Sequence, residues 1–404
     1  MNTIEKKCNK YKRSGIATVA KRVGLYPYFN SISSEQGPIV TMADRDVIML
    51  GSNNYLGMTG HPAVKERAEE TIKKFGVGTT GSRLLNGTFH IHNELEQRLA
   101  TFLGKEDCIV FSTGMQANLG AISSLITPTH DEYVLSDEYN HASIIDALVL
   151  SKMPRDKKLI FKHNDMQDLR EQISNIPKGT GLIITEGVFS MEGDIPPLDE
   201  LVKIAKKYDA MIYLDDAHGV GVLGPEGRGA AAHFEVTKDI DIIMGTFSKS
   251  FASCGGYIAA NKSICNWVRH HARSFIFSAS IPPANCATVL AVLDLIEHDN
   301  SYRKNLIHLA DRMRKGLVDA GFHISKSTTP VIPIIIGDDI LTFRVFKRLF
   351  RKKPKGVFTN PIRSPAVPEG RELLRTSYMA SMNEEIVDEA LAILTRVGKK
   401  MKII

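Results

Sequence analysis

The feature that most constrains the fold is an alternation, between about residues 107 and 260, of short apolar runs with turns and helical stretches. The apolar runs are 108–111, 132–135, 158–161, 181–185, 210–214 and 240–245. Strands that alternate with helices form a mostly parallel sheet that is covered by helices on both faces. Such sheets bind ligands at the carboxyl ends of their strands. The pattern therefore predicts an α/β domain whose functional residues directly follow the apolar runs.

The length of 404 residues is more than one ordinary core needs. We expect an N-terminal arm over residues 1–50, a large domain over 51–290 and a small C-terminal α/β domain over 291–404. Helical periodicity predicts three helices outside the alternating region, at 61–75, 92–103 and 284–296.

Charge and cysteine content narrow the class of protein. A net charge of +6 is modest for this length and gives no reason to expect nucleic-acid binding. The five cysteines form no C-x-x-C pair, which favours reduced thiols. The N-terminal residues lack the apolar core of a signal peptide, and no apolar run reaches the ~18 residues of a membrane span. We therefore expect a cytoplasmic protein.

The basic amphipathic stretch Arg344–Lys355 has two interpretations. It is a solvated helix face, or it attracts coenzyme A phosphates or a membrane surface. The second interpretation predicts a peripheral contact with the inner membrane.

A lysine stands among hydroxyls after the last apolar run. Lys249 follows Thr246 and Ser248 in the segment T-F-S-K-S. Hydroxyls bind phosphate, and a partly desolvated lysine amine forms imines readily. This segment is a candidate for a covalent cofactor site.

Two acidic residues end the apolar run 210–214. Asp215 and Asp216 precede Ala217 and His218. Buried carboxylates need partners. A metal ion is one such partner, although D-D-x-H lacks the further ligands of a closed site. A protonated ring nitrogen is the other.

Three further turns follow apolar runs. The turn at Gly114 opens a helix and suits a phosphate, or is an ordinary strand-to-helix turn. His141 is a structural histidine, or its ring stacks on a flat cofactor. The polar segment 186–194 has no explanation in core packing.

Together these motifs resemble the α-oxoamine synthase family of fold-type I pyridoxal-phosphate enzymes. The similar stretches include G-S-N-N-Y-L-G (51–57), S-T-G-M-Q-A-N (112–118), L-D-D-A-H-G-V-G (214–221), G-T-F-S-K-S (245–250) and L-L-R-T-S-Y-M-A (373–380). They occur in collinear order over nearly the whole chain. The resemblance implies a large domain with a mostly parallel seven-stranded sheet, a smaller C-terminal α/β domain and an N-terminal arm.

The resemblance also implies a reaction, the decarboxylating condensation of an amino acid with an acyl-CoA or acyl-carrier thioester to give a 2-amino ketone. The segments S-E-Q-G-P (34–38) and N-P-I-R-S-P-A-V-P (360–368) are most similar to the serine palmitoyltransferase subfamily, which favours L-serine. Glycine-using relatives, which make 8-amino-7-oxononanoate or 2-amino-3-ketobutyrate, are the alternative within the fold. A non-catalytic partner subunit is the alternative outside enzymes.

Roles are carried over residue by residue. Lys249 matches the lysine that binds the cofactor in the family. Asp215 matches the carboxylate that faces the ring nitrogen, and His218 matches the partner of the phenolic oxygen. His141 matches the histidine that stacks on the cofactor ring. Further positions match residues that hold the cofactor, mostly at its phosphate: Gly114, Met115, Ser190, Thr246 and Ser248. The resemblance also implies a homodimer with shared active sites, pyridoxal phosphate as cofactor and no metal. Ser278 and Ser280 match a segment that reaches the partner's phosphate, and Asn54 and Arg375 match residues at the substrate carboxylate.

Overall fold

The structure is a computed structural model, and it describes residues 2–128 and 130–404. Their internal contacts divide them into two compact units. The larger unit comprises 53–307 with 379–381, and the smaller comprises the residues up to Ser52 together with 308–378 and 382–404. The N-terminal segment thus groups with the C-terminal residues. The division falls after 307 instead of at 290, because α12 (Pro283–His298) packs against α3 (Pro62–Phe75) and α4 (His90–Phe102) of the larger unit.

The larger unit is built on a seven-stranded sheet of order β3-β9-β8-β7-β6-β4-β5. The strands are β3 (Asp107–Phe111), β4 (Tyr133–Asp137), β5 (Lys158–Phe161), β6 (Gly181–Glu186), β7 (Met211–Asp215), β8 (Ile242–Thr246) and β9 (Gly256–Ala260). β9 pairs antiparallel with both β3 and β8, and the other neighbouring strands of this sheet pair parallel. The predicted α/β fold with a mostly parallel seven-stranded sheet is confirmed.

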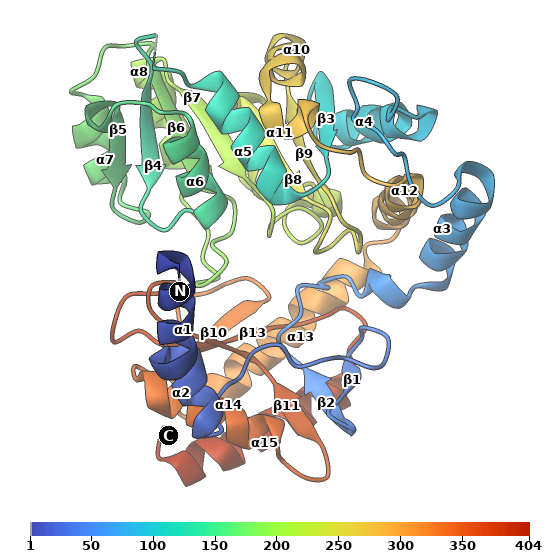
Figure 1. Ribbon diagram of the computed structural model, residues 1–404, viewed down its shortest axis with the longest axis vertical. Coiled ribbons are helices and arrows are strands. Elements are labelled where there is room, and N and C mark those ends of the chain that lie inside the picture. The colour runs from blue at the N-terminus through green and yellow to red at the C-terminus, as the bar shows by residue number, and fades with distance from the viewer. Residues whose placement is uncertain (1, 129) are drawn as a thin grey trace. The chain divides into compact units, whose positions relative to one another are not determined.

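Burial explains why these strands are continuous apolar runs instead of alternating ones. Every residue of β6 and of β9 is buried, as expected for strands covered on both faces. One apolar core joins the strands to the helices α5 (Gly114–Leu125), α6 (Ala142–Leu150), α10 (Lys262–His271) and α11 (Arg273–Ile276). Figure 1 shows α5 and α6 lying across these strands. The carboxyl ends of β4, β6, β7 and β8 therefore meet at one edge of the sheet.

Shorter elements complete the larger unit. They are α7 (Met166–Ile173), α8 (Leu198–Tyr208), α9 (Ala230–His233) and the 3-10 turns η1 (Met58–Gly60), η2 (Arg155–Lys157), η3 (Pro225–Gly227) and η4 (Thr237–Asp239). The long helix α13 (Ser301–Asp319) begins in the larger unit and ends in the smaller one.

The smaller unit contains two three-stranded sheets. In the first, β2 (Arg45–Met49) pairs antiparallel with β1 (Ile39–Met42) and parallel with β11 (Gly356–Phe358). In the second, β13 (Leu373–Ser377) lies between β10 (Val331–Ile335) and β12 (Asn360–Ile362). The unit also contains helices α1 (Thr3–Ser14), α2 (Ile16–Arg22), α14 (Asp339–Phe350) and α15 (Glu384–Met401).

The apolar half of the amphipathic pattern in the basic stretch is buried in helix α14. Its apolar side chains, Phe343, Phe346 and Leu349 among them, are buried inside the smaller unit. The amphipathic pattern of Arg344–Lys355 is therefore explained by packing of one helix face, which leaves that face unavailable to lipid.

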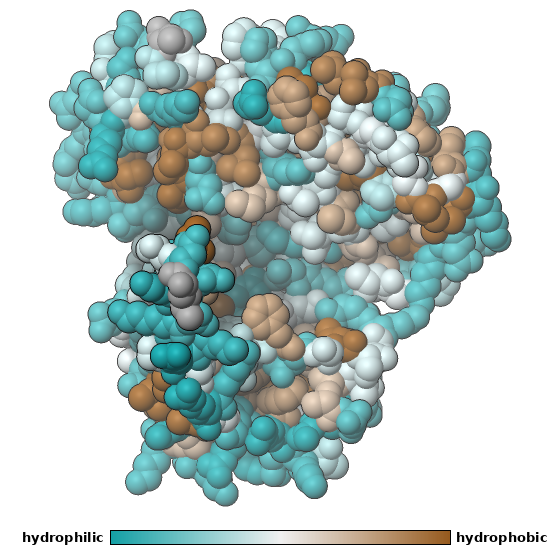
Figure 2. All heavy atoms as spheres, viewed as in Figure 1, coloured by the Kyte–Doolittle hydropathy of each residue, from teal (hydrophilic) through white to brown (hydrophobic). Residues whose placement is uncertain are grey.

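Helix α1 differs from α14, because no residue of α1 is buried. Hydrophilic side chains cover the viewed side of this helix (Figure 2). In the part of the chain that the structure describes, no helix combines the length and the apolar character needed to cross a membrane.

Candidate active site

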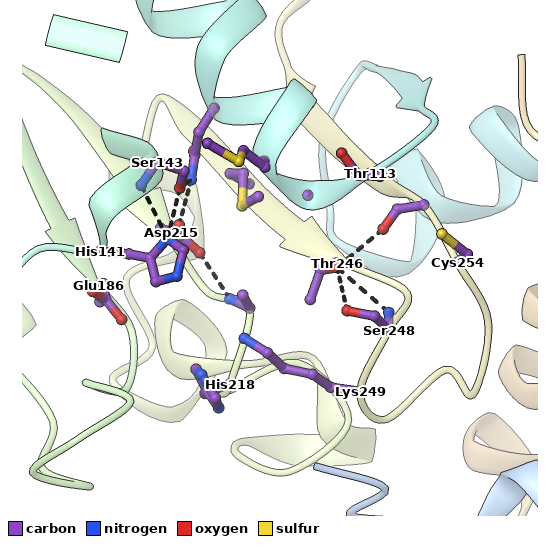
Figure 3. A pocket seen from close by; sticks show the side chains of 16 residues that line it. Thr113, His141, Ser143, Glu186, Asp215, His218, Thr246, Ser248, Lys249 and Cys254 are labelled. Carbon is purple, nitrogen blue, oxygen red and sulfur yellow. Dashed lines mark hydrogen bonds between the residues drawn. The ribbon is translucent and has the colours of Figure 1, made fainter. Parts of the chain in front are cut away.

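A cavity with about 260 Å³ of space lies at the carboxyl edge of the large sheet. Its walls come from the segments that follow β3, β4, β6, β7 and β8. Figure 3 shows His141, Asp215 and Lys249 pointing toward this space. The lining residues are Thr113, Gly114, Met115, Asn118, His141, Ser143, Glu186, Asp215, Ala217, His218, Met244, Thr246, Ser248, Lys249, Cys254 and Gly255.

Asp215 is the last residue of β7 and is buried. One carboxylate oxygen, Oδ2, accepts a hydrogen bond from the Asn118 amide at 2.7 Å, and the other, Oδ1, accepts the N–H of Ala217 at 3.1 Å. Asn118 is itself fixed, because its oxygen accepts the Tyr213 hydroxyl at 2.7 Å and its nitrogen also donates to Ser143 at 2.8 Å. This network holds an acceptor-only group at the floor of the cavity.

The neighbouring Asp216 does not line the cavity. It is buried, and Oδ2 accepts the N–H of Ala230 at 2.7 Å. The closely packed backbone of Gly187 and Gly219 surrounds the other oxygen, since a Cβ at either glycine would come within 2.0 Å of it. Burial raises the pKa of Asp216 to about 8. The two adjacent carboxyl groups therefore have different tasks, Asp215 at the cavity and Asp216 in the fold.

His141 precedes α6 and caps it. Its Nδ1 accepts the N–H of Ser143 at 3.2 Å and lies 2.8 Å from the Ser143 hydroxyl. A neutral ring with Nδ1 as acceptor carries its proton on Nε2. Burial lowers the pKa of His141 and is the largest cause; the negative charge of Asp215 opposes it, and the positive charge of Lys249 lowers the pKa further. The ring is therefore neutral near pH 7.

His218 lies on the same side of the cavity as Lys249 in Figure 3. The Nδ1 atom of His218 lies 2.7 Å from the hydroxyl of Tyr55. Tyr55 is buried and belongs to the G-S-N-N-Y-L-G motif. The motif thus contributes a residue that orients His218, a role that the sequence alone did not suggest.

The segment after β8 carries the lysine. Lys249 is half-buried and lines the cavity. Thr246 Oγ1 lies 3.0 Å from the hydroxyl of Ser248 and 3.0 Å from the carbonyl oxygen of Gly255, to which it donates. The lysine and both hydroxyls that the sequence predicted are therefore brought together.

The first turn of α5 faces this segment. Thr113 caps the helix by accepting the N–H of Gln116 at 3.1 Å. A Cβ at Gly114 would lie 2.9 Å from Thr246 Oγ1, so the glycine permits a close approach of helix and strand end. Met115 is exposed beside it and lines the cavity. Helix N–H groups and hydroxyls here form a cradle suited to an anion.

Two ionisable lining residues, Glu186 and Cys254, were not singled out from the sequence. Glu186 ends β6 directly beside Asp215 of β7, and burial, followed by the charge of Asp215, raises its pKa well above the ordinary value. Cys254 follows the lysine segment and its thiol approaches the carbonyl oxygen of Ser112 at 3.6 Å. Glu186 was visible only as part of a polar segment, and Cys254 gave no sequence signal at all.

The other predicted residues of the larger unit lie outside the lining. Ser190 follows β6 and is half-buried. Asn54 donates to the hydroxyl of Thr59 at 2.7 Å, and Ser278 accepts from the Gln116 amide at 3.0 Å.

Ser280 forms its hydrogen bonds outside the cavity lining. Its hydroxyl donates to the carbonyl oxygen of Gly87 at 2.6 Å, which holds the turn at 81–87. Arg375 belongs to the smaller unit, where it is buried on the central strand β13. The expected roles of these residues remain predictions. Within residues 2–128 and 130–404, no group of three or more His, Cys, Asp or Glu side chains is placed to hold a metal ion.

Comparison with known proteins agrees with this geometry. Residues 45–394 match the family Aminotransferase class I and II. A serine palmitoyltransferase of Bacteriovorax stolpii is 50% identical over 377 residues, which cover 93% of this chain and 88% of that protein. A putative 8-amino-7-oxononanoate synthase of Acetivibrio thermocellus is 42% identical over 394 residues, which cover 98% and 100%.

Solved structures also resemble this chain over its whole length. One, of a serine palmitoyltransferase with pyridoxal phosphate, superposes with a TM-score of 0.93 at 34% identity and covers all of both chains. The resemblance drawn from the motifs is confirmed, and the chain belongs to the aminotransferase class I and II family, within the α-oxoamine synthases.

Proposed function

We propose that this chain condenses L-serine with a long-chain acyl-CoA, with release of coenzyme A and CO2, and that it uses pyridoxal phosphate. The observation that carries the proposal is the convergence of Lys249, Asp215 and His141 on one cavity. The 50% identity to a serine palmitoyltransferase supports the choice of substrates.

The residues present fit the cofactor. Asp215 is an acceptor-only carboxylate, held by two hydrogen bonds, that would face a protonated ring nitrogen. The cradle of Gly114, Thr246 and Ser248 would hold the phosphate. Lys249 supplies the amine. When bound, pyridoxal phosphate supplies an electron sink for a carbanion at the amino acid.

The chain's own groups would position the reactants and hold protons. The Lys249 amine lines the cavity and would act as base or acid there, and His141 offers a proton on Nε2. The Tyr55 hydroxyl fixes the ring of His218. We further propose that Asn54 and Arg375 bind the substrate carboxylate, a task that suits a guanidinium group.

We also propose that the protein is a homodimer with shared sites. Support comes from exposed apolar side chains on two neighbouring segments of the larger unit, Val77 and Leu85 on one and Phe277 on the other. The two segments are joined by a bridge between Ser82 and Ala279. A second copy of the chain would cover these side chains and bring Ser278 to the partner's site.

A cytoplasmic location is part of the proposal, since all five cysteines are unpaired. A peripheral contact with a membrane through Arg344–Lys355 would rest on its basic side chains alone, because the apolar face of α14 is buried.

A second candidate function is the condensation of glycine, because the 8-amino-7-oxononanoate synthase relative is 42% identical. Titration of the cofactor's visible absorbance with serine and with glycine separates the two. We expect serine to change the spectrum at lower concentration than glycine. A preference for glycine, followed by faster turnover of short acyl thioesters or of acyl-carrier protein than of long acyl-CoA, would overturn the choice of substrates and leave the reaction class in place.

A further inference from the structure

A half-buried histidine outside the cavity has two carboxylates as neighbours. His163, in the loop after β5, places Nδ1 at 3.1 Å from Asp137 Oδ1 and Nε2 at 2.9 Å from Asp194 Oδ2. The exposed fractions of the side chains are 15% for His163, 0% for Asp137 and 28% for Asp194. Both ring nitrogens thus face acceptors in a poorly solvated setting.

The surrounding contacts fix the ring. The ring of Tyr139 stacks on His163 with centroids 4.3 Å apart, and Phe189 meets it edge-on at 4.4 Å. Asn164 strengthens the same links, since its N–H donates to Asp137 at 2.9 Å and its side chain donates to Asp194 at 3.0 Å.

The two carboxylates favour a protonated ring, although the Asn164 side-chain nitrogen also lies 3.3 Å from Nε2. A neutral imidazole has one N–H and would point a lone pair at one of the carboxylates. Burial alone would lower the pKa of His163, but the hydrogen bonds to Asp137 and Asp194 outweigh burial and raise the pKa to about 9. The other ionisable neighbours are Glu138, whose carboxylate accepts the N–H of His163 at 3.0 Å, and the stacked Tyr139. The negative charge of Glu138 also favours an imidazolium.

The first carboxylate, Asp137, lies in the same short segment as His141 of the cavity wall. Asp137 ends β4 and also accepts the N–H of Tyr139 at 2.8 Å. The side chain of Asn140 then donates to the carbonyl oxygen of Ile184 in β6 at 2.8 Å. The next residue is His141. The imidazolium therefore holds the short segment that ends at the cavity histidine.

The second carboxylate, Asp194, belongs to the loop after β6 that carries Ser190. Phe189 and Asp194 enclose the turn that carries Ser190, which is closed by a hydrogen bond from the Phe189 N–H to the Asp194 carbonyl oxygen at 3.0 Å. The ring of His163 contacts both ends of this turn.

We propose that His163 is a positioning residue, whose imidazolium joins the segments 136–141 and 189–194 and thereby sets the place of His141 in the cavity. The proposal rests on the proposed function in one respect, namely that His141 contacts the cofactor. Its effect on catalysis is indirect, because His163 does not line the cavity.

The test uses the pyridoxal-phosphate-loaded enzyme labelled with 13C at the histidine ring. His163→Asn identifies the resonance and removes the cationic bridge, while Asp194→Asn keeps the ring and removes one carboxylate. His90→Asn is the control, because His90 is exposed on α4. The His163 resonance should titrate near pH 9 in the parent enzyme and at lower pH in Asp194→Asn.

Steady-state kinetics supply the second readout. Because a small displacement of a catalytic group is costly, His163→Asn should lower kcat roughly tenfold or more while the KM for acyl-CoA changes less than about twofold. His90→Asn should change neither. A His163 midpoint near 6.5, or a kcat of His163→Asn within about twofold of the parent, would overturn the proposal. If no product forms from serine, the proposed function fails, but the titration still tests the bridge. If His163→Asn does not fold, the parent and Asp194→Asn titrations decide.

Discussion

Replacement of Asp215 by asparagine tests the role of the carboxylate most sharply, because the structure shows what the amide cannot do. Both carboxylate oxygens accept a hydrogen bond, Oδ2 from Asn118 at 2.7 Å and Oδ1 from the Ala217 N–H at 3.1 Å. An amide has one acceptor and one donor group. Whichever way the Asp215→Asn side chain turns, its NH2 faces another donor.

Asp215→Asn should affect two quantities, the free energy of folding and the activation free energy of the reaction. An unsatisfied donor in this buried site costs about 1–3 kcal/mol of folding free energy. Loss of the negative charge removes stabilisation from the reacting centre, and we expect a fall in kcat on the order of a hundredfold or more, which corresponds to ~2.7 kcal/mol of activation free energy.

Asp216→Asn is the matched control. Its Oδ2 accepts from Ala230, a bond that an amide oxygen can keep, and the pKa of about 8 means that the native group is already neutral at pH 7. We expect kcat to change only a few-fold, since a neutral acid is replaced by a neutral amide.

Steady-state condensation of serine with palmitoyl-CoA, measured beside thermal unfolding of all three proteins, separates the two parts. Equal losses of kcat in the two variants, or a larger loss in Asp216→Asn, would refute the assignment of Asp215 to the reacting centre.

Three further predictions concern the cofactor, the assembly and pH. Lys249→Ala should fold, by circular dichroism, yet lose condensation, and borohydride reduction with peptide mapping of the parent should place the cofactor on Lys249 and on no other residue. A mixture of inactive Lys249→Ala and inactive Ser278→Trp, refolded together, should regain part of the activity, whereas an active monomer in sedimentation would exclude shared sites. Burial raises the pKa of Asp216 from 3.8 to about 8, so the unfolded chain releases this proton at lower pH than the folded chain, and the free energy of unfolding falls as pH rises from about 4 to 8. Asp216→Asn should therefore flatten the dependence of Tm on pH over that range. An unchanged slope would contradict the raised pKa.

The parts of the fold that the sequence predicted are those set by local pattern. The parallel strands appear within about two residues of the apolar runs, since a strand buried on both faces needs a continuous run. The antiparallel strand β9 was not predicted, because its short run G-Y-I-A-A follows the lysine loop without a helix between them. The pairing of β2 with β11 joins residues about 300 positions apart, and no local pattern records such a contact.

In the site, too, some residues were predictable from local pattern and others depend on contacts between distant parts of the chain. Lys249, Asp215 and His141 directly follow predicted strands, so the topology alone brings them to one edge of the sheet. Asn118 and Tyr55 act through contacts made only after folding, one with Asp215 and one with His218. Both residues lie in motifs that resemble the family, but nothing in a linear pattern states which side chain meets which.

The most direct test of the central claim follows the carboxyl carbon of serine. The enzyme is supplied with pyridoxal phosphate, palmitoyl-CoA and L-serine labelled with 13C at the carboxyl carbon. We predict one labelled CO2 for each coenzyme A released and a 2-amino ketone without label, identified by mass. Coenzyme A release with the label retained in the product, or no release with serine but release with glycine, would contradict the account.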